Sequence, residues 1–475
     1  MTADGFLARL QVTARAHPRR LAVAGPGVAL THGELAERVA GMAVWLARAG
    51  MAAGTMAGVT LREDLAHLVV TLALLRLGCH QVTLGSHEPA AQRADIAARA
   101  RVDVVVADDP GDALPGVALL LPDHDAAAAG APGALPAASE AEALLVMTSS
   151  GTTGRPKLIP LRQAQLLAQS VRRAGLGAVR HRPVGLEHNN GMRFPLFALA
   201  NGDTHVLAAA SRSESLAATC ARYRVDMLGL APHQAESLLA ARRDGAWPAV
   251  TRIDLAGAAP GDGLVRRLQA ALTDQVFTLY GTSEVGSVAR AGPADHAACP
   301  EGSGRVLPTA EVQVVDDSGA ALPAGETGLL RLRTAGMAQG YLDDVEATAR
   351  CFIDGWFQPG DLGRLLADGT LIVAGRADDM MVLGSINIFP AEIERAAAGF
   401  PGLGECTAFA RRSLGLGDIP MLAATEVAPG SLDAAALLAH CRARLGLRAP
   451  RGIVVMAALP RNVAGKVMRH ELTRG

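Results

Sequence analysis

The run Thr148-Ser149-Ser150-Gly151-Thr152-Thr153-Gly154-Arg155-Pro156-Lys157 begins where a short apolar stretch, residues 143–148, ends. Such a stretch is typical of a buried strand. The glycines of the run allow backbone N–H groups to converge on an anion, and its hydroxyl groups add donors. The run therefore predicts a phosphate-binding loop that follows a strand. It is not a Walker A loop, because no Ser or Thr follows Lys157. Taken alone, a Gly/Ser/Thr run is also typical of a flexible linker.

Lysine is almost absent from the chain. Of its 45 basic residues only Lys157 and Lys466 are lysines, which leaves 43 arginines. A lysine kept in such a background points to a task for a compact ammonium on a flexible stem, which arginine cannot supply. Chance is the alternative explanation for either lysine alone. Both, however, lie beside small-residue runs, since Lys466 ends the run Asn462-Val463-Ala464-Gly465-Lys466.

Short Val/Leu/Ile runs alternate with Ala/Leu/Arg patterns of helical period through most of the chain. This alternation predicts an α/β fold in which helices cover sheets. The apolar run 68–75 fits a turn of buried helix or a strand. Further strands are expected at residues 102–107, 143–148, 227–230, 253–255 and 275–280. Helices are expected at residues 34–49, 163–174 and 263–271.

From about residue 311 the sequence pattern changes to short strands separated by turns, which indicates a smaller β-rich subdomain. Its strands are expected at residues 312–315, 328–332, 363–366 and 371–374. After Arg376 about a hundred residues of mixed α and β pattern remain, which is enough for a small, mobile C-terminal domain. The sequence thus predicts a large N-terminal part and a small C-terminal domain.

Composition narrows the classes of function. Half of the residues (50%) are hydrophobic and the net charge is −1. A large core is therefore expected, and neither nucleic acid nor an anionic membrane is indicated as a partner. The six scattered cysteines form no metal-binding or disulfide pattern. No signal peptide or membrane span is apparent, so a cytoplasmic protein is expected. It is expected to be a monomer or a homodimer.

Three further motifs carry candidate chemistry. Tyr280-Gly281-Thr282-Ser283-Glu284 follows an expected strand. Its glutamate offers the carboxylate oxygen that Mg²⁺ prefers beside phosphate oxygens, and its tyrosine can stack on a base. Asp361, directly after Gly360, can accept both hydroxyls of a ribose, and Arg376 is followed by two acids at 378 and 379. Singly, these motifs are equally typical of solvated turns and surface ion pairs.

Taken in this order, and followed by the Lys466 run, the motifs resemble those of the adenylate-forming (ANL) superfamily. That superfamily comprises acyl- and aryl-CoA synthetases, adenylation domains and luciferases. The resemblance extends from residues 30–35 (Leu-Thr-His-Gly-Glu-Leu) to Lys466, and residues 375–394 resemble the hinge and the segment after it. It implies an ANL fold with an AMP-binding domain at residues 1–377, a mobile lid domain at residues 378–475, and a hinge at Asp378.

The resemblance also assigns roles to residues. Lys466 would bridge the attacking carboxylate and the α-phosphate of ATP, and Glu284 would ligate Mg²⁺. Tyr280 and the run Gly257-Ala258-Ala259 would enclose adenine, while Asp361 and Arg376 would hold the ribose. The remaining residues expected to bind ATP or AMP are Thr148, Ser149, Ser150, Gly151, Thr152, Thr153, Gly154, Lys157, Gly281 and Thr282.

The run Leu186-Glu187-His188-Asn189-Asn190-Gly191 resembles the segment that lines the acid pocket. His188 would position the substrate carboxylate. Aryl-acid adenylating enzymes have a similar His-Asn pair, whereas amino-acid adenylating domains place an aspartate where Asn189 stands. Since an amide cannot neutralise an ammonium, the resemblance favours a small aromatic acid. The full set of expected pocket residues is His188, Asn189, Asn190, Gly191, Phe194, Gly229 and Ala231.

The expected activity is ATP-dependent formation of an acyl-AMP, then transfer of the acyl group to the thiol of CoA. Transfer to the phosphopantetheine thiol of a carrier protein, or to an amine, is the alternative. The alternative acceptors stay open because Ser385 stands where many CoA ligases have a glycine. A nucleotide-binding pseudoenzyme is the alternative of another class.

Overall fold

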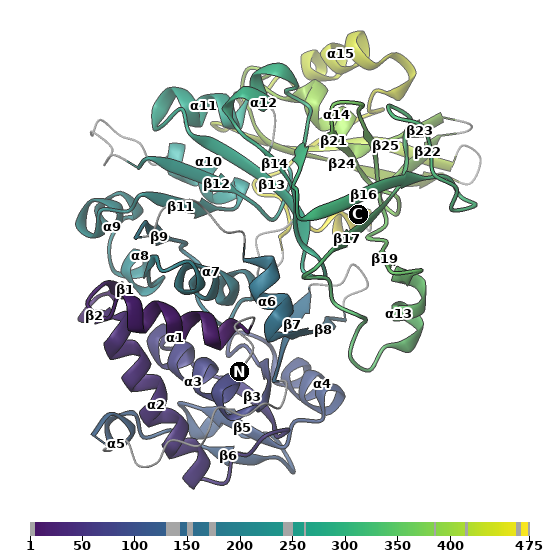
Figure 1. The fold of residues 1–475 in the computed structure, drawn as a ribbon. Helices are drawn as coiled ribbons and strands as arrows, with labels where there is room; N and C mark the ends of the chain where they lie inside the picture. Colours follow the sequence, from purple (N-terminus) through teal and green to yellow (C-terminus); the bar gives the residue numbers. More distant parts are fainter. Residues whose placement is uncertain are drawn as a thin grey trace.

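The architecture is taken from a computed structural model. The structure describes residues 5–129, 143–149, 155–170, 177–240, 250–260, 263–383, 386–413, 417–461 and 467–473. Three sheets follow one another along the long axis of the molecule (Figure 1). The N-terminal sheet lies at one end, the longest sheet in the middle, and the C-terminal sheet at the other end.

The N-terminal sheet has six strands, of which the first five in its order run parallel and the last is antiparallel. In spatial order they are β6 (Ala118–Leu120), β5 (Val104–Ala107), β3 (Met56–Thr60), β4 (His80–Thr83), β7 (Leu144–Ser149) and β8 (Lys157–Arg162). The helices of this region are α1 (Phe6–Ala16), α2 (His32–Arg48), α3 (Asp64–Leu77), α4 (Ala90–Ala100), α5 (His124–Ala129) and α6 (Gln163–Gln169), with a 3₁₀ turn at Pro110–Asp112.

Local sequence signals explain the two helices that pack against each other in this region. Helix α2 begins with a capping box, in which the Thr31 hydroxyl accepts from the Glu34 N–H and the Glu34 carboxylate accepts from the Thr31 N–H. Helix α3 is apolar on all sides and nearly all of its residues are buried, as expected for a helix in the centre of a core. It ends at Gly78, whose φ of 76° suits a glycine. The run 68–75 is therefore helical.

The middle sheet contains fifteen strands. Its parallel part, from one edge inward, is β1 (Leu21–Gly25), β10 (Thr204–Val206), β9 (Val179–His181), β11 (Met227–Leu230), β12 (Arg252–Leu255) and β13 (Val276–Thr282), with β2 (Val28–Thr31) antiparallel at the edge. The antiparallel part comprises β14 (Gly286–Ala291), β15 (Gly304–Val306), β16 (Ala310–Val315), β17 (Gly328–Thr334), β18 (Phe352–Ile353), β19 (Trp356–Phe357), β20 (Asp361–Leu365) and β21 (Thr370–Arg376).

The strands predicted after residue 311 are all present, and the structure adds how they are joined. Strand β21 pairs with β15 through the Gly304↔Leu371 register, so the β-rich subdomain continues the middle sheet. One face of the parallel part buries a core with α9, α10 and α11, and α7 lies toward the N-terminal sheet. The helices of this region are α7 (Asn189–Ala200), α8 (Ala209–Ser213), α9 (Leu216–Tyr223), α10 (Pro232–Ala240), α11 (Leu264–Ala271), α12 (Pro293–Ala298) and α13 (Val345–Cys351).

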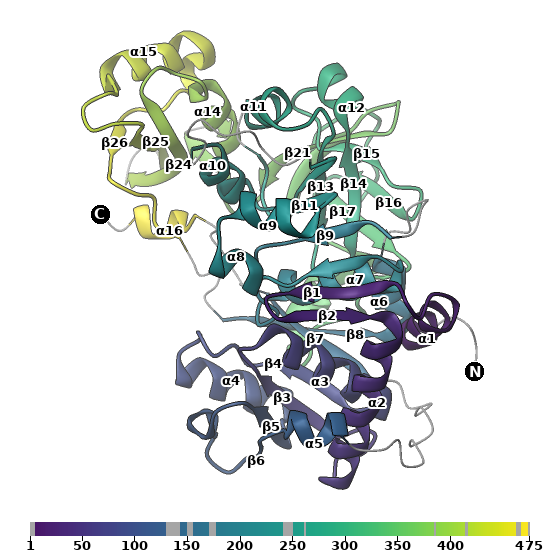
Figure 2. The ribbon, with the colours of Figure 1, turned by 90° about the vertical axis from the view of Figure 1, so that its left-hand side faces the viewer.

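The C-terminal sheet is formed wholly from residues after 380 and has its own apolar core (Figure 2). Its strands are β22 (Met381–Leu383), β23 (Ile386–Ile388), β24 (Leu403–Ser413), β25 (Gly417–Glu426) and β26 (Ile453–Val455). Its helices are α14 (Pro390–Ala397), α15 (Ala434–Leu445) and α16 (Arg469–Leu472), with a 3₁₀ turn at Gly446–Arg448. No helix in the described part of the chain is long and apolar enough to cross a membrane.

Candidate active site

The predicted phosphate loop connects the antiparallel strands β7 and β8, whose ends pair through Ser149↔Lys157. Thr148 and Ser149 end β7. The five residues between the strands that were expected to bind phosphate, Ser150, Gly151, Thr152, Thr153 and Gly154, lie outside the described residues. The hairpin nevertheless fixes both ends of the loop beside one another.

Lys157 points from β8 toward a tyrosine that the sequence reading did not select. Its Nζ lies 3.4 Å from the hydroxyl oxygen of Tyr341 and 4.6 Å from the centre of that ring. The Tyr341 hydroxyl in turn donates a hydrogen bond of 2.9 Å to Oε1 of Glu284. Burial and the charge of Glu284 both raise the pKa of Tyr341 above its usual value. The phosphate loop and the metal-binding candidate are therefore joined by one chain of polar contacts.

Glu284 is buried, with 7% of its surface exposed. It lies in the turn that connects β13 to β14, close to the shift in their register. A Cβ at Gly281 would come within 2.1 Å of the Gly286 carbonyl oxygen, so this tight turn requires glycine. Thr282 Oγ1 is buried there and has no hydrogen-bond partner among the residues that the structure describes. Within the described residues no three His, Cys, Asp or Glu side chains gather around a metal site. A single carboxylate still fits Mg²⁺, which commonly binds one or two carboxylates together with substrate phosphates.

Tyr280, Asp361 and Arg376 form a second cluster, from three strands of the middle sheet. The Tyr280 hydroxyl donates a hydrogen bond of 2.6 Å to Oδ2 of Asp361. Arg376 lies 3.7 Å from Oδ1 of the same carboxylate and 2.9 Å from Asp378. Burial, followed by the charge of Asp361, raises the pKa of Tyr280 well above its usual value. The structure thus brings together three residues that the sequence places up to 96 positions apart (280 to 376).

The glycine at 360 and the run Gly257-Ala258-Ala259 shape the same region. Gly360 has a φ of 81°, and a Cβ there would come within 3.3 Å of the Arg376 guanidinium. The run 257–259 follows strand β12 and is exposed, with a φ of 99° at Gly257. Because β12 pairs with β13, the run lies at the end of the strand next to the one that carries Tyr280.

His188 is the residue before helix α7, and its ring lies against that of His87, with 4.3 Å between ring centres. Burial, and then the proximity of His87, lowers the pKa of His188. Glu187 accepts hydrogen bonds from the N–H of Ser86 at 2.7 Å and from its hydroxyl at 3.0 Å. The loop after β4 therefore fixes the loop before α7. The sequence reading missed His87 and Ser86, which carry no motif of their own.

Two predicted pocket glycines have clear steric reasons. A Cβ at Gly191 would come within 1.8 Å of the Gly185 carbonyl oxygen, so helix α7 can approach its own preceding loop only with glycine there. A Cβ at Gly229 would come within 2.6 Å of the Phe194 ring, so these two residues face each other. Ala231 follows β11 directly, and its N–H donates to Gln234 at 2.9 Å. The side chains of Asn189 and Asn190 lie outside what the structure describes.

Lys466 also lies outside the described residues, but both flanks of its loop are placed. Arg461 and Val467 pair as an isolated antiparallel bridge, and the Met468 N–H donates to the Pro460 carbonyl at 2.8 Å. Burial lowers the pKa of His233, at the start of α10, and the nearby charge of Arg461 lowers it further. The loop that carries Lys466 therefore begins and ends close to the strand ends that carry the predicted acid pocket.

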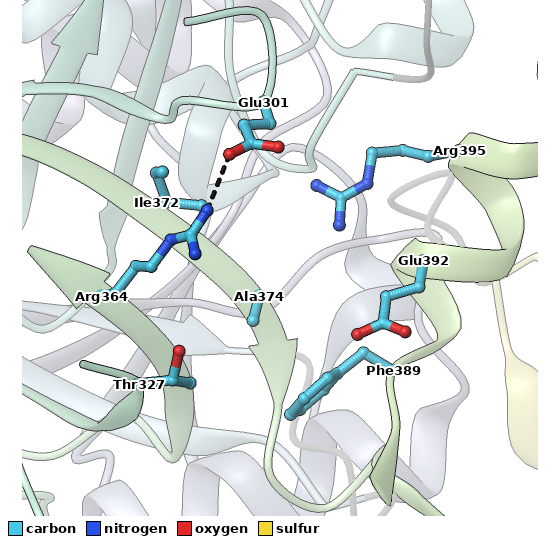
Figure 3. Close-up of a pocket in the computed structure, with 8 residues that line it drawn as sticks. All are labelled: Glu301, Thr327, Arg364, Ile372, Ala374, Phe389, Glu392 and Arg395. Atoms are coloured by element: carbon cyan, nitrogen blue, oxygen red, sulfur yellow. Dashed lines mark hydrogen bonds and ion pairs between the residues drawn. The ribbon is translucent and has the colours of Figure 1, made fainter. Parts of the chain in front are cut away.

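A cavity of about 150 Å³ separates strands β20 and β21 from helix α14 (Figure 3). An ion pair of 2.8 Å between Arg364 and Glu301 lies on one side of it, and Arg395 and Glu392 of α14 lie on the other. None of the predicted site residues lines this cavity. It belongs to the junction between the middle sheet and the C-terminal part.

With this geometry in place, comparison with known proteins identifies the family. Residues 10–342 match the AMP-binding enzyme family. The chain belongs to this family. The enzyme is 28% identical to the 2-succinylbenzoate–CoA ligase of Geobacillus kaustophilus (strain HTA426), with 96% of this chain and 95% of that protein covered. It is also 28% identical to the indoleacetate–CoA ligase of Aromatoleum aromaticum, over 69% of this chain and 66% of that protein.

Solved structures agree on the fold. The amide bond synthetase McbA from Marinactinospora thermotolerans superimposes with a TM-score of 0.87 at 23% identity, over 99% of both chains. The expected ANL fold and the resemblance to the adenylate-forming superfamily are therefore confirmed. So is the expected class of enzyme, an AMP-forming acid–thiol ligase.

Proposed function

We propose that this AMP-binding enzyme activates a small aromatic carboxylic acid as its acyl-AMP and transfers the acyl group to the thiol of CoA. The observation that carries the proposal is the pair of polar clusters, Tyr280–Asp361–Arg376 and Lys157–Tyr341–Glu284. One offers a carboxylate for ribose hydroxyls, and the other offers a cation and a carboxylate for a metal-bound phosphate. The relatives that act on aromatic acids support the choice of substrate class.

In the first half-reaction, a carboxylate oxygen of the acid attacks the α-phosphorus of ATP, and pyrophosphate leaves. Two anions must approach each other, so the work of the protein is mainly positioning and charge neutralisation. Lys466 supplies a positive charge between the two oxyanions, and His188, neutral because its pKa is lowered, positions the acid without adding a competing charge. Glu284 would hold Mg²⁺, which when bound would supply positive charge beside the phosphate oxygens.

In the second half-reaction, the thiol sulfur attacks the acyl carbonyl carbon, the bond to phosphate breaks, AMP leaves and the thiol proton passes to solvent. The domain organisation supports a change of state between these steps. The C-terminal sheet has its own core, and Asp378 pairs with Arg376 at 2.9 Å across the expected boundary at residues 377/378. We therefore assign the hinge to Asp378 and the mobile lid to residues 378–475.

The acceptor of the acyl group has specific alternatives to CoA. Because the fold is similar to that of an amide bond synthetase, an amine is the second candidate, and a carrier-protein thiol is the third. We favour CoA because two relatives that match nearly the whole chain are CoA ligases, one for 2-succinylbenzoate and one for 4-chlorobenzoate. Incubation with acid, ATP and each acceptor in turn, with mass detection of thioester or amide, separates the three.

The decisive test of the first half-reaction is acid-dependent exchange of labelled pyrophosphate into ATP, over a panel of benzoates, phenylacetates, cinnamates and aliphatic acids. We expect exchange with aromatic acids. No exchange with any acid, together with normal AMP binding, would favour a nucleotide-binding pseudoenzyme instead. The matched control is the same panel without Mg²⁺, which should abolish exchange.

A further inference from the structure

Arg182, directly after β9, is a buried cation that forms no ion pair with any described residue. Only 5% of its surface is exposed, and its buried Nε has no hydrogen-bond partner within the described part of the chain. It contacts the ring of Phe194, whose centre lies 5.4 Å from the guanidinium carbon. Burial lowers its pKa to about 10. An unpaired charge in such a place is costly unless a ligand meets it.

The sheet register places Arg182 beside the predicted acid pocket. Leu228 of β11 pairs with His181, so the next residues along the two parallel strands, Gly229 and Arg182, are neighbours. Gly229 faces Phe194, which also contacts Arg182. Arg182, directly after β9, thus lies beside Gly229 of β11 and Phe194 of α7, and the Phe194 ring packs where a side chain at Gly229 would stand.

The neighbouring charges do not neutralise Arg182. The nearest acid along the register, Asp254 beside Gly229 on β12, is paired with Arg252 at 2.6 Å. Its field raises the pKa of Arg182 only as a secondary effect after burial. On the other side, His205 lies 6.4 Å from the Phe194 ring and is itself held uncharged at neutral pH, because burial lowers its pKa to about 3. Within the described residues the Arg182 guanidinium thus has no ion pair, and it lies beside the predicted pocket residues Phe194 and Gly229.

The distance from His188 gives the pocket a length. Helix α7 carries the chain from His188 to Phe194, six residues that rise about 9 Å along the axis. The substrate carboxylate is assigned to the His188 end. An acid that spans this distance has room for one aromatic ring with a substituent opposite its carboxylate.

From this geometry we infer that the acid carries a second oxygen acceptor, at the end remote from the reacting carboxylate, and that Arg182 binds it through its guanidinium. A second carboxylate is the best match, because Arg can bind it through two parallel hydrogen bonds. The inference rests on the proposed function and narrows its substrate class to aromatic acids with a distal oxygen group. Arg182 acts here as a specificity-determining residue that does not contact the reacting atoms.

The test compares matched pairs of acids in pyrophosphate exchange. Each pair has the same ring and linker, with and without an oxygen group opposite the activated carboxylate: benzoate with benzene-1,4-dicarboxylate or 4-hydroxybenzoate, and phenylacetate with its 4-carboxy and 4-hydroxy derivatives. We expect kcat/KM to be at least ten-fold higher for the oxygen-bearing member of a pair. The 4-carboxy and 4-hydroxy arms tell whether the acceptor is an anion or a neutral hydroxyl.

The variant Arg182→Met, which keeps an unbranched apolar stem but removes the guanidinium, should remove this preference while leaving exchange with the unsubstituted acid within about two-fold. Arg182→Lys should keep part of it. Arg76→Met is the matched control, since Arg76 also has a buried Nε without a hydrogen-bond partner among the described residues. Arg76 lies about 18 Å along the axis of α3 from Asp64, which accepts a hydrogen bond from the N–H of Leu186 in the predicted pocket segment.

Equal activity with both members of every pair, or a preference that survives in Arg182→Met, would overturn the inference. Loss of exchange with every acid in Arg182→Met would be checked by the thermal midpoint and by the Arg182→Lys variant. If Arg182→Lys is folded and shows no preference, the inference also fails. Absence of exchange by the parent enzyme with any acid is a different result, which contradicts the proposed function itself.

Discussion

At the scale of single residues, Lys466 is the side chain on which the first half-reaction depends most. Lys466→Ala should lower the rate of acid-dependent pyrophosphate exchange by at least a hundred-fold, because the ammonium acts where two oxyanions meet in the transition state. The affinity for ATP should change little. Exchange kinetics and equilibrium titration with ATP measure the two quantities.

Lys466→Arg is the matched variant for this change. It keeps the charge but replaces a compact ammonium by a planar guanidinium, so we expect only partial recovery. Full activity in Lys466→Ala would remove the residue from the mechanism.

The hydrogen bond between Tyr280 and Asp361 gives a second prediction at this scale. Tyr280→Phe removes the 2.6 Å hydrogen bond to Asp361 but keeps the ring and the contact of 3.7 Å between Asp361 and Arg376. AMP affinity should fall by about three- to ten-fold, the range for one hydrogen bond of about 1 kcal/mol. Asp361→Asn should lose more, because it alters the group assigned to the ribose hydroxyls.

Fluorescence or calorimetric titration with AMP measures both variants. Tyr223→Phe, a half-buried tyrosine on α9, is the control and should bind AMP normally. If Tyr280→Phe binds AMP as tightly as the parent, the hydroxyl does not orient Asp361 for the nucleotide.

At the scale of secondary-structure elements, helix α16 fixes the segment that follows Lys466. Arg469 donates to Asp379 and to Glu394, both at 2.9 Å, and to the Thr407 hydroxyl at 3.2 Å. The charges of these two acids raise its pKa against the effect of burial. This network ties the end of the Lys466 loop to the expected hinge and to the C-terminal sheet.

Arg469→Ala should therefore lower kcat for acyl-AMP formation by about ten-fold or more while leaving KM for ATP within about two-fold, because it frees the loop that presents Lys466. Arg448→Ala is the matched control, since it removes an ion pair of 3.4 Å to Glu392 from the surface of the same part of the chain. Steady-state kinetics decide. Equal loss in both variants would show that α16 serves stability alone.

Elements were predictable from the sequence where local pattern and burial agree. Strand β11 lies at residues 227–230 as expected, and β12 and β13 lie within two residues of their expected ends. The run 68–75 stayed ambiguous because an element that is apolar on every side has no period, and its helical state depends on the surrounding core.

Candidate site residues could be selected from the sequence only where a motif indicates their chemistry. Four were selected in this way, and the structure brings them together in two clusters: Tyr280, Glu284, Asp361 and Arg376. Tyr341, His87 and Arg182 were missed, because each is a single residue in an unremarkable run. Their roles arise from tertiary contacts with Glu284, His188 and Phe194 that no spacing along the chain reveals.

At the scale of the whole molecule, histidines buried in different regions link stability to pH. Burial lowers the pKa of His32, His67 and His181 to about 4 and that of His205 to about 3. All four have at most 4% of their surface exposed. In the unfolded chain each would titrate near 6.5, so between pH 6.5 and pH 4 the unfolded state binds protons that the folded state does not.

This difference in proton binding determines how stability changes with pH. Above pH 6.5 these histidines are neutral in both states and have no effect on the pH dependence of stability. As the pH falls from 6.5 toward 4, proton binding favours the unfolded state, by up to about 1.4 kcal/mol per pH unit for each histidine. We therefore expect the urea midpoint of unfolding to decrease steadily from pH 7 to pH 5, with uptake of protons on unfolding near pH 5.5.

Urea denaturation at several pH values, with proton uptake measured by calorimetry in buffers of different ionisation enthalpy, tests this expectation. His67→Gln isolates one group, because His67 is fully buried on α3 and its Nδ1 lies 3.0 Å from the Leu61 carbonyl oxygen. The variant should take up about one proton fewer on unfolding near pH 5. A stability that is unchanged from pH 7 to pH 5, or proton release instead of uptake, would mean that these buried histidines are already charged in the folded enzyme.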